Sequence, residues 1–361
     1  MKLLDRYMAQ ELGGPFLFGL AAFTLLFVAG QLLNIARLVS EEHASAFAAA
    51  KYFVYTLPAT LVLTIPMSML LAVLLAMGRL SGDSELTAMR AGGISLYRVA
   101  APLIAIGFVA SLVALLFQED VVPAAAATAN DILRREIQSG HGSLVGNSLV
   151  STVLPNGDLQ VTYAQSFDQR TEELQSTTVE VFRHNVLTSL LFAPRAKYGG
   201  DKWTFFDAKL YQLTPACCKV GDWPVLNIDI GADPTELLEQ TKQPEDMSRA
   251  EIARYLGRTN RAADPSRYAL LEVTYHSKLA RPFTTLVFTL LAMPLGVRPQ
   301  RSSSGAGFGI SIALIFAFYV VTTVCLAIGR SIPASSFVMA WLPNVAFCAA
   351  GLRLMQKAAM A

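Results

Sequence analysis

The sequence predicts an α-helical membrane protein with six transmembrane helices and an inserted all-β domain. Of its 361 residues, 53% are hydrophobic and only 16% are charged, which is unusual for a soluble domain of this length. Several long segments have no charged residue and can cross a hydrocarbon core of about 30 Å. Between the third and fourth of them, β-branched and aromatic residues alternate with turn signals. These observations place two helical halves on either side of an extramembrane insertion.

Six charge-free segments are the expected membrane spans. The fourth is short for a span, but residues 268–281 before it are mostly apolar on one helical face and can lengthen that helix. The six segments are residues 12–36, 52–78, 99–117, 282–297, 305–329 and 331–352.

Lysine and arginine residues beside the spans predict the orientation, because these residues are retained on the cytoplasmic side. Nine fall on one side, whereas only Arg37, Lys51 and Arg330 fall in the short opposite loops. We therefore expect both termini on the cytoplasmic side and the stretch at about 118–277 on the extracytoplasmic side. The nine residues are Lys2, Arg6, Arg79, Arg90, Arg98, Arg298, Arg301, Arg353 and Lys357.

The first residues also resemble a secretory signal, because Lys2 and Arg6 precede an apolar run and Ala44-Ser45-Ala46 follows it. We reject this interpretation, since the apolar run is about twice the usual signal length and cleavage would leave five spans. Residues 1–11 are instead expected to form an amphipathic lead-in at the cytoplasmic interface. Its apolar side chains are Leu3, Leu4, Tyr7 and Met8.

The chain changes character at Gly140, where seven short strands are expected. Many short antiparallel strands favour a sandwich or a jelly roll over a parallel sheet. The predicted strands are residues 143–154, 159–164, 177–183, 186–192, 202–206, 210–213 and 225–230.

Five consecutive regions follow from these boundaries. Helices at 124–138 and 248–258 are expected within the two connectors that flank the β domain. The regions are a transmembrane half (1–118), a connector (119–140), a β-jelly-roll domain (141–235), a second connector (236–267) and a second transmembrane half (268–361).

A polar segment between the second and third spans has charges of both signs. It predicts a short helix at about 81–95, which Ser81 or Asp83 can cap and which Gly92-Gly93 ends. An amphipathic helix at the membrane surface fits a groove on a soluble partner, although a solvated connector that packs on neighbouring helices is an equal alternative. The candidate contact residues are Asp83, Ser84, Glu85, Leu86, Met89 and Arg90.

Motifs for nucleotide binding and for catalysis are missing from the sequence. No Gly-Lys dipeptide occurs, so no phosphate-binding GxxxxGK[ST] loop is possible, and no GxSxG nucleophile motif occurs. The histidines His43, His141, His184 and His276 are isolated, and the cysteines Cys217, Cys218, Cys325 and Cys348 form no framework. We therefore expect no enzyme, no cofactor, no metal site and no nucleic-acid partner, and any ATP is hydrolysed by another polypeptide.

Motifs along the whole chain resemble the LptF/LptG (YjgP/YjgQ) permease family of the bacterial lipopolysaccharide exporter. The N-terminal half resembles the LptF type slightly more. The matching motifs are Leu4-Asp5-Arg6-Tyr7, Pro66-Met67-Ser68-Met69-Leu70-Leu71 with Gly78-Arg79-Leu80, Asp83-Ser84-Glu85-Leu86-Thr87-Ala88-Met89-Arg90-Ala91-Gly92-Gly93, Lys278-Leu279-Ala280-Arg281-Pro282, Met293-Pro294-Leu295-Gly296 and Trp341-Leu342-Pro343-Asn344.

The resemblance implies six transmembrane helices with a periplasmic β-jelly roll between the third and fourth. In that family two permeases pair, bind a dimer of cytoplasmic ABC ATPases, and extract lipopolysaccharide from the outer leaflet of the inner membrane. The jelly rolls pass the lipid to periplasmic bridge proteins. Family coupling helices have an acidic residue at the position of Glu85, which is therefore the first candidate for contacting the ATPase.

An exported lipid needs basic residues for its anionic head group and a sheltered route for its acyl chains. Arg37 ends the first span at the outer leaflet and is a candidate, with interface anchoring as an equal alternative. Lys278 and Arg281 can also meet phosphates, but pairing with Glu272 is favoured there. Candidate inward-facing positions on the strands are Val161, Val181 and Phe205.

Two other functions fit many of the same features. A membrane-anchored scaffold would use the β domain for binding and would not need a coupling helix. A permease for another lipid or for lipoproteins would share the architecture.

Overall fold

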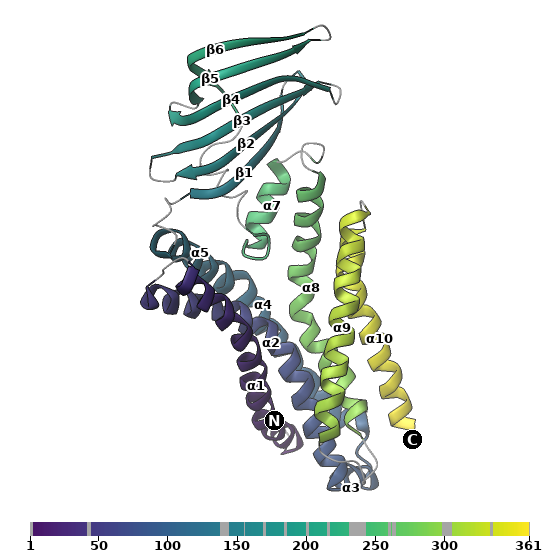
Figure 1. Ribbon diagram of the computed structural model, residues 1–361. Coiled ribbons are helices and arrows are strands. Elements are labelled where there is room, and N and C mark those ends of the chain that lie inside the picture. The colour runs from purple at the N-terminus through teal and green to yellow at the C-terminus, as the bar shows by residue number, and fades with distance from the viewer. Residues whose placement is uncertain are drawn as a thin grey trace.

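Six long helices and one β-sheet make up the computed structural model of the chain (Figure 1). The helices are α1 (Leu3–Glu41), α2 (Ala46–Gly82), α4 (Leu96–Leu116), α8 (Pro265–Gly296), α9 (Gly305–Ser331) and α10 (Ser336–Met360). All six are long and apolar enough to cross a membrane, which confirms the predicted fold class. The structure describes residues 3–41, 45–137, 144–154, 156–168, 171–183, 186–199, 202–214, 217–230, 243–258, 261, 265–297, 305–332 and 335–360.

Some residues singled out in the sequence lie outside this description. They are Lys2, His43, Gly140, His141, His184, Arg298 and Arg301, together with the side chains of Cys217 and Cys218.

The helices extend beyond the charge-free segments that predicted them. Helix α10 continues past Arg353 and Lys357 to Met360, and α8 includes the whole apolar stretch that starts at residue 268. Long basic side chains reach the surface while their backbone stays helical, so a charge marks the edge of the apolar region and not the end of the helix. The predicted start of the last span at 331 was wrong, because Ser331 still belongs to α9.

The predicted amphipathic lead-in is continuous with the first long helix in the residues that the structure describes. From Leu3 it is the first part of α1, in which Met8 and Leu12 are only 1% and 3% exposed. Leu4 and Tyr7 pack on the same core, whereas Leu3 is exposed. The apolar face is real, but its partners are the neighbouring helices.

Helices α2 and α8 lie at the centre of the bundle and pack closely against each other. Gly296 of α8 faces Met77 of α2, and a Cβ atom added at Gly296 would lie 2.5 Å from the Met77 Cβ. Helix α4 approaches α8 in the same way where Gly107 faces Thr289. Small residues bring helix backbones together where the apolar effect between helices is weak, as in a lipid environment.

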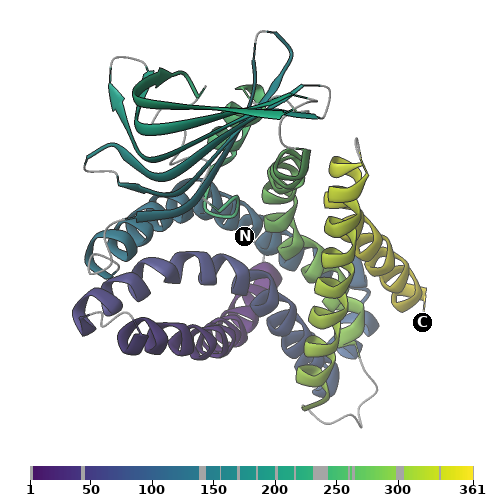
Figure 2. The same ribbon diagram turned by 45° about the horizontal axis from the view of Figure 1, so that its top comes forward.

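The β domain is one six-stranded antiparallel sheet in the order β1-β2-β3-β4-β5-β6. Figure 2 shows this sheet twisted and curved over the helices. Each strand pairs with its neighbour in sequence, so the described residues form a meander and not the two-sheet sandwich with crossing connections that a jelly roll has. The strands are β1 (Leu144–Val153), β2 (Leu159–Asp168), β3 (Glu173–Arg183), β4 (Val186–Gly199), β5 (Lys202–Thr214) and β6 (Cys217–Ile228).

Strand β5 joins two segments that were predicted as separate strands. Asp207 between them has a positive φ of 52°, yet pairing with β6 continues on both sides of it. One face of the curved sheet buries large side chains, including those of Phe167, Trp203 and Phe205. Curvature lets a single sheet enclose its own apolar face.

Short helices connect the sheet to the bundle. The incoming segment is η1 (Phe117–Val121), α5 (Val122–Ile132) and η2 (Leu133–Ile137), and the outgoing helix is α7 (Arg249–Arg258). Figure 1 shows the N-terminal end of α1, the C-terminal end of α10 and the short helix α3 (Glu85–Ala91) at the end of the bundle opposite the sheet.

Candidate functional site

The polar segment between α2 and α4 is organised differently from the predicted capped helix. Helix α2 continues to Gly82, so Ser81 lies inside its last turn and Asp83 is its C-terminal cap. Helix α3 starts at Glu85 after Ser84, which has a φ of 60° and whose side chain makes no capping bond to α3. The predicted N-terminal cap by Ser81 or Asp83 was therefore wrong, because α2 continues to Gly82 and the next helix begins only at Glu85.

The two sides of α3 have different surroundings. Leu86 is 3% exposed and Met89 packs partly on the same core, while Thr87, Ala88 and Arg90 are exposed. The helix ends at Gly92 as predicted, and the following Gly93 has a φ of 83° that favours glycine. The exposed side is the surface that a soluble partner can reach.

Glu85 lies in a network that joins α3 to α1 and α2. Its Oε2 accepts a hydrogen bond from the Tyr7 hydroxyl at 2.5 Å, and its Oε1 lies 3.9 Å from the Arg79 guanidinium. Arg79 also donates to the Tyr7 hydroxyl at 3.1 Å and pairs with Glu11 at 2.8 Å. The carboxylate that the sequence offered to a partner protein is thus engaged within its own chain.

A second ion pair lies near this network. Arg98, at the start of α4, lies 2.6 Å from Asp5 of α1. Together the two clusters tie the first turns of α1 to the ends of α2, α3 and α4. We call the contacts among Tyr7, Glu11, Arg79 and Glu85 the α1–α3 network.

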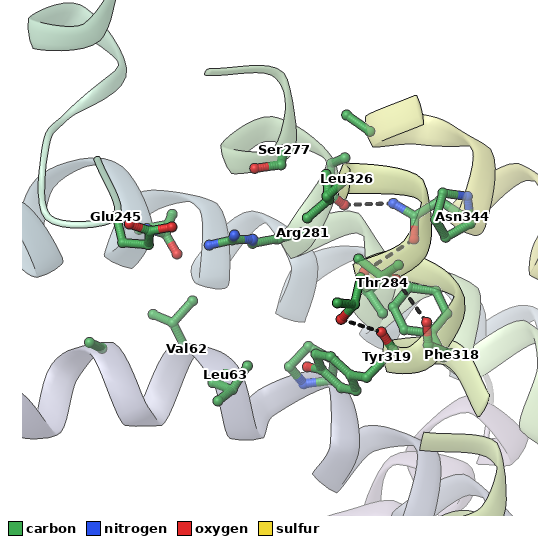
Figure 3. A pocket seen from close by; sticks show the side chains of 18 of the residues that line it. Val62, Leu63, Glu245, Ser277, Arg281, Thr284, Phe318, Tyr319, Leu326 and Asn344 are labelled. Atoms are coloured by element: carbon green, nitrogen blue, oxygen red, sulfur yellow. Dashed lines mark hydrogen bonds between the residues drawn. The ribbon is translucent and has the colours of Figure 1, made fainter. Parts of the chain in front are cut away.

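A cavity of about 380 Å³ opens among α2, α8, α9 and α10, nearer to the β domain than the α1–α3 network. Arg281 of α8 extends across it toward Glu245, as Figure 3 shows. Arg281 forms no ion pair with any residue that the structure describes. Asn344 lines the same cavity and links α10 to α8 through bonds to the Ala280 carbonyl at 2.7 Å and to Thr284 at 3.1 Å.

Lys278 does not line this cavity, but it binds Glu245, which does. Its side chain is completely buried, and its ammonium donates to the Glu245 carbonyl at 2.7 Å. The predicted pairing of Lys278 or Arg281 with Glu272 was wrong, since Glu272 accepts from Ser336 and lies 4.0 Å from Arg261. Residues six or nine apart on a helix point to different faces, so they do not meet.

An apolar groove of about 660 Å³ adjoins the Arg281 cavity. It lies between α1 and α9 over α2, and its lining is almost entirely apolar. Leu63 and Tyr319 line both spaces, so the groove and the Arg281 cavity are neighbours. The groove residues are Ala22, Phe23, Leu26, Phe27, Leu63, Met67, Phe308, Ile312, Ile315, Phe316 and Tyr319.

Arg37 lies near the other end of α1, on the side of the β domain. Its side chain is exposed, and it forms no ion pair within the described part of the chain. Its position leaves both interpretations open, a contact with a head group and an anchor at the interface.

The three strand positions proposed for acyl chains do not all lie on one face. Phe205 is fully buried on the apolar face, and Val181 pairs with the buried Gln160 on that face. Val161 pairs with Glu180, while its neighbours Gln160 and Thr162 are buried, so it points to the other face. Strand residues alternate, and a shift of one residue in the predicted phase reverses the face.

Comparison with known proteins covers nearly the whole chain. The model of the family described as "Lipopolysaccharide export system permease LptF/LptG" matches residues 6–357. The chain belongs to this family. A curated relative, the lipopolysaccharide export system permease protein LptG of Haemophilus influenzae, is 24% identical in an alignment of 340 residues that covers 89% of each chain. Membership and six apolar helices identify a multi-pass inner-membrane permease of the lipopolysaccharide export system.

The LptF/LptG motifs contain residues whose contacts the sequence did not predict. The sequence pattern indicates an apolar side chain at Tyr7 and a cytoplasmic charge at Arg79, whereas in the structure both side chains contact Glu85. Asn344 was noted only as part of a motif. For Asn344 the sequence did contain a signal, because a polar side chain inside an apolar span needs a hydrogen-bond partner.

Proposed function

We propose that this permease extracts lipopolysaccharide from the outer leaflet of the inner membrane with energy from ATP that a separate ABC ATPase dimer hydrolyses. The lipid then passes through the β domain, which we place in the periplasm, to periplasmic bridge proteins. Both termini and α3 are on the cytoplasmic side in this arrangement, as the distribution of basic residues favours.

The adjoining groove and cavity are the observation that best supports a lipid substrate. Acyl chains fit an apolar groove, because each buried methylene is worth about 0.8 kcal/mol. An anionic head group fits beside an arginine that has no ion-pair partner among the described residues. One amphiphile can therefore use both spaces at once across Leu63 and Tyr319.

Partners are proposed from the surfaces that the chain leaves exposed. The exposed side of α3 at Thr87, Ala88 and Arg90 fits a groove on the ATPase. Apolar side chains such as Leu25, Leu26 and Phe316 are more than 60% exposed on α1 and α9, next to the groove. A second permease of the same family would complete the wall of the groove there, and membrane lipid covers the rest.

Copurification and bound-lipid mass spectrometry test this proposal. The permease should copurify with an ATPase and contain lipopolysaccharide after gentle extraction. Failure to copurify with any ATPase would favour the scaffold alternative, and an ATPase without bound lipopolysaccharide would contradict the proposed substrate. An ATPase with a different bound lipid, or with a lipoprotein, would support a permease of another substrate.

Photo-crosslinkers in the sheet test the proposed transfer to the β domain. Groups at Val181 and Phe205 should capture lipid only when ATP is supplied, because acyl chains must be driven out of the membrane. Val161 on the other face is the matched control and should capture little. Equal capture at all three positions, or capture without ATP, would contradict the transfer step.

A further inference from the structure

The short helix α3 has little to stabilise it except its contacts with other helices. It contains seven residues, and the side chain of Ser84 does not cap its first turn. Leu86 alone among its residues is classed as buried. Helices this short are not stable by themselves in water, so their position depends on tertiary contacts. The α1–α3 network is the polar part of those contacts.

Glu85 faces its own chain through both of its carboxylate oxygens. The Tyr7 hydroxyl and the Arg79 guanidinium approach different oxygens, and Arg79 is itself fixed by Glu11 of α1. The side chain of Glu85 is 35% exposed, less than those of Arg79 and Asp83 beside it. The start of α3 is thus attached to α1 directly through Tyr7, and indirectly through Arg79 of α2, which pairs with Glu11.

Helix α1 connects this network to the apolar groove. Tyr7 and Phe23 of α1 are 16 positions apart, a distance of roughly 24 Å along a helix. Met8, Leu12 and Phe23 belong to one buried core that also includes Leu86 of α3. This continuous packing lies on both sides of Pro15, the proline inside α1. A displacement of α3 therefore has a packed connection to a helix that lines the groove.

We infer that Tyr7 and Arg79 are positioning residues that hold the Glu85 carboxylate and so lock the coupling helix α3 to α1. When an ATPase moves α3, the lock moves α1 and changes the shape of the lipid groove. Glu85 then acts on the lipid path through α1, and the exposed residues of α3 make the contact with the ATPase. That an ATPase moves α3 rests on the proposed function, whereas the contacts that form the lock lie within this chain.

Hydrogen exchange of the permease alone tests the lock without an ATPase. Tyr7→Phe keeps the ring and removes the hydroxyl that binds Glu85. Amides of residues 85–91 should exchange about tenfold faster in this variant, as expected when one hydrogen bond to a charged group is lost. Tyr97→Phe is the matched control, because Tyr97 is 53% exposed on α4 at the same end of the bundle. Unchanged exchange in Tyr7→Phe, or the same acceleration in Tyr97→Phe, overturns the lock whether or not an ATPase binds.

Transport by the complete complex tests the consequence of the lock. In proteoliposomes, Tyr7→Phe should retain the ATPase and its ATP hydrolysis while lipid released per ATP falls by about fivefold or more. The double variant Tyr7→Phe with Glu85→Gln should be no worse than the more defective single variant, because both changes break one contact. If Tyr7→Phe releases as much lipid per ATP as the wild type, or if the losses of lipid release add up in the double variant, the inference is contradicted. Failure of wild-type permease to bind any ATPase contradicts the proposed function instead, and exchange alone then decides the lock.

Discussion

Two regions of the helical bundle differ in how their charged side chains are paired. Near α3, the carboxylates of Asp5, Glu11, Asp83 and Glu85 each lie within 4.0 Å of Arg79 or Arg98. In the cavity beneath the sheet, Arg281 has no ion-pair partner among the described residues. Paired charges fix the geometry of neighbouring helices, whereas an arginine that forms no ion pair among the described residues can still bind an anion. This difference is the basis of the two roles proposed above, a mechanical one for the α1–α3 network and ligand binding for the Arg281 cavity.

Reversing the charge of Glu85 should have the largest effect. Glu85→Lys places an ammonium beside Arg79 and removes the acceptor for Tyr7. ATP-driven lipid release should fall by about 10- to 100-fold, corresponding to roughly 1.5–3 kcal/mol for a hydrogen bond to a charged group. The association of the Glu85→Lys variant with the ATPase should be measured in the same preparations.

Asp83→Lys is the control for this change, because Asp83 is 60% exposed and only 4.0 Å from Arg79 at its nearest. It should reduce release far less. Normal transport by Glu85→Lys would remove Glu85 from coupling altogether, both as a contact and as part of the lock.

Removing the charge of Arg281, in the cavity beneath the sheet, should have the next largest effect. Arg281→Gln should reduce the amount of copurified lipopolysaccharide by about tenfold, because one charge-assisted contact in the cavity is lost. ATP hydrolysis should continue, since the α1–α3 network is intact.

Arg330→Gln provides the comparison for Arg281, since Arg330 is an exposed arginine at the end of α9. Equal lipid content in the two variants would show that the Arg281 cavity is not a site for the head group.

The smallest effect is expected at Arg37, which is exposed to its surroundings. If it meets an anionic head group, Arg37→Glu should lower lipid release by up to about fivefold and Arg37→Lys should not, as for a screened surface charge. Release assays in proteoliposomes with both variants decide this. Equal release by the two variants would leave Arg37 as an interface anchor.

Local sequence patterns predicted several elements because their causes are local. Six apolar segments, the stop at Gly92-Gly93 and the run of β-branched residues after Gly140 all depend on nearby residues. Predictions that depended on a partner were less successful. Glu272 was expected to pair with Lys278, yet its partners are Ser336 and Arg261, which are distant in sequence.

Residue composition by itself predicted six membrane spans, because long charge-free segments suit a hydrocarbon core, and six helices of the described chain are long and apolar enough to cross a membrane. It also determined that the third and fourth spans enclose a β domain. Only the tertiary structure decided which charges are satisfied. Tyr7 and Glu85 are 78 residues apart and meet because α1 packs beside α2. Arg281 remains without an ion pair in the described chain because the helices around it leave a cavity, and no local pattern specifies where helix packing leaves such a space.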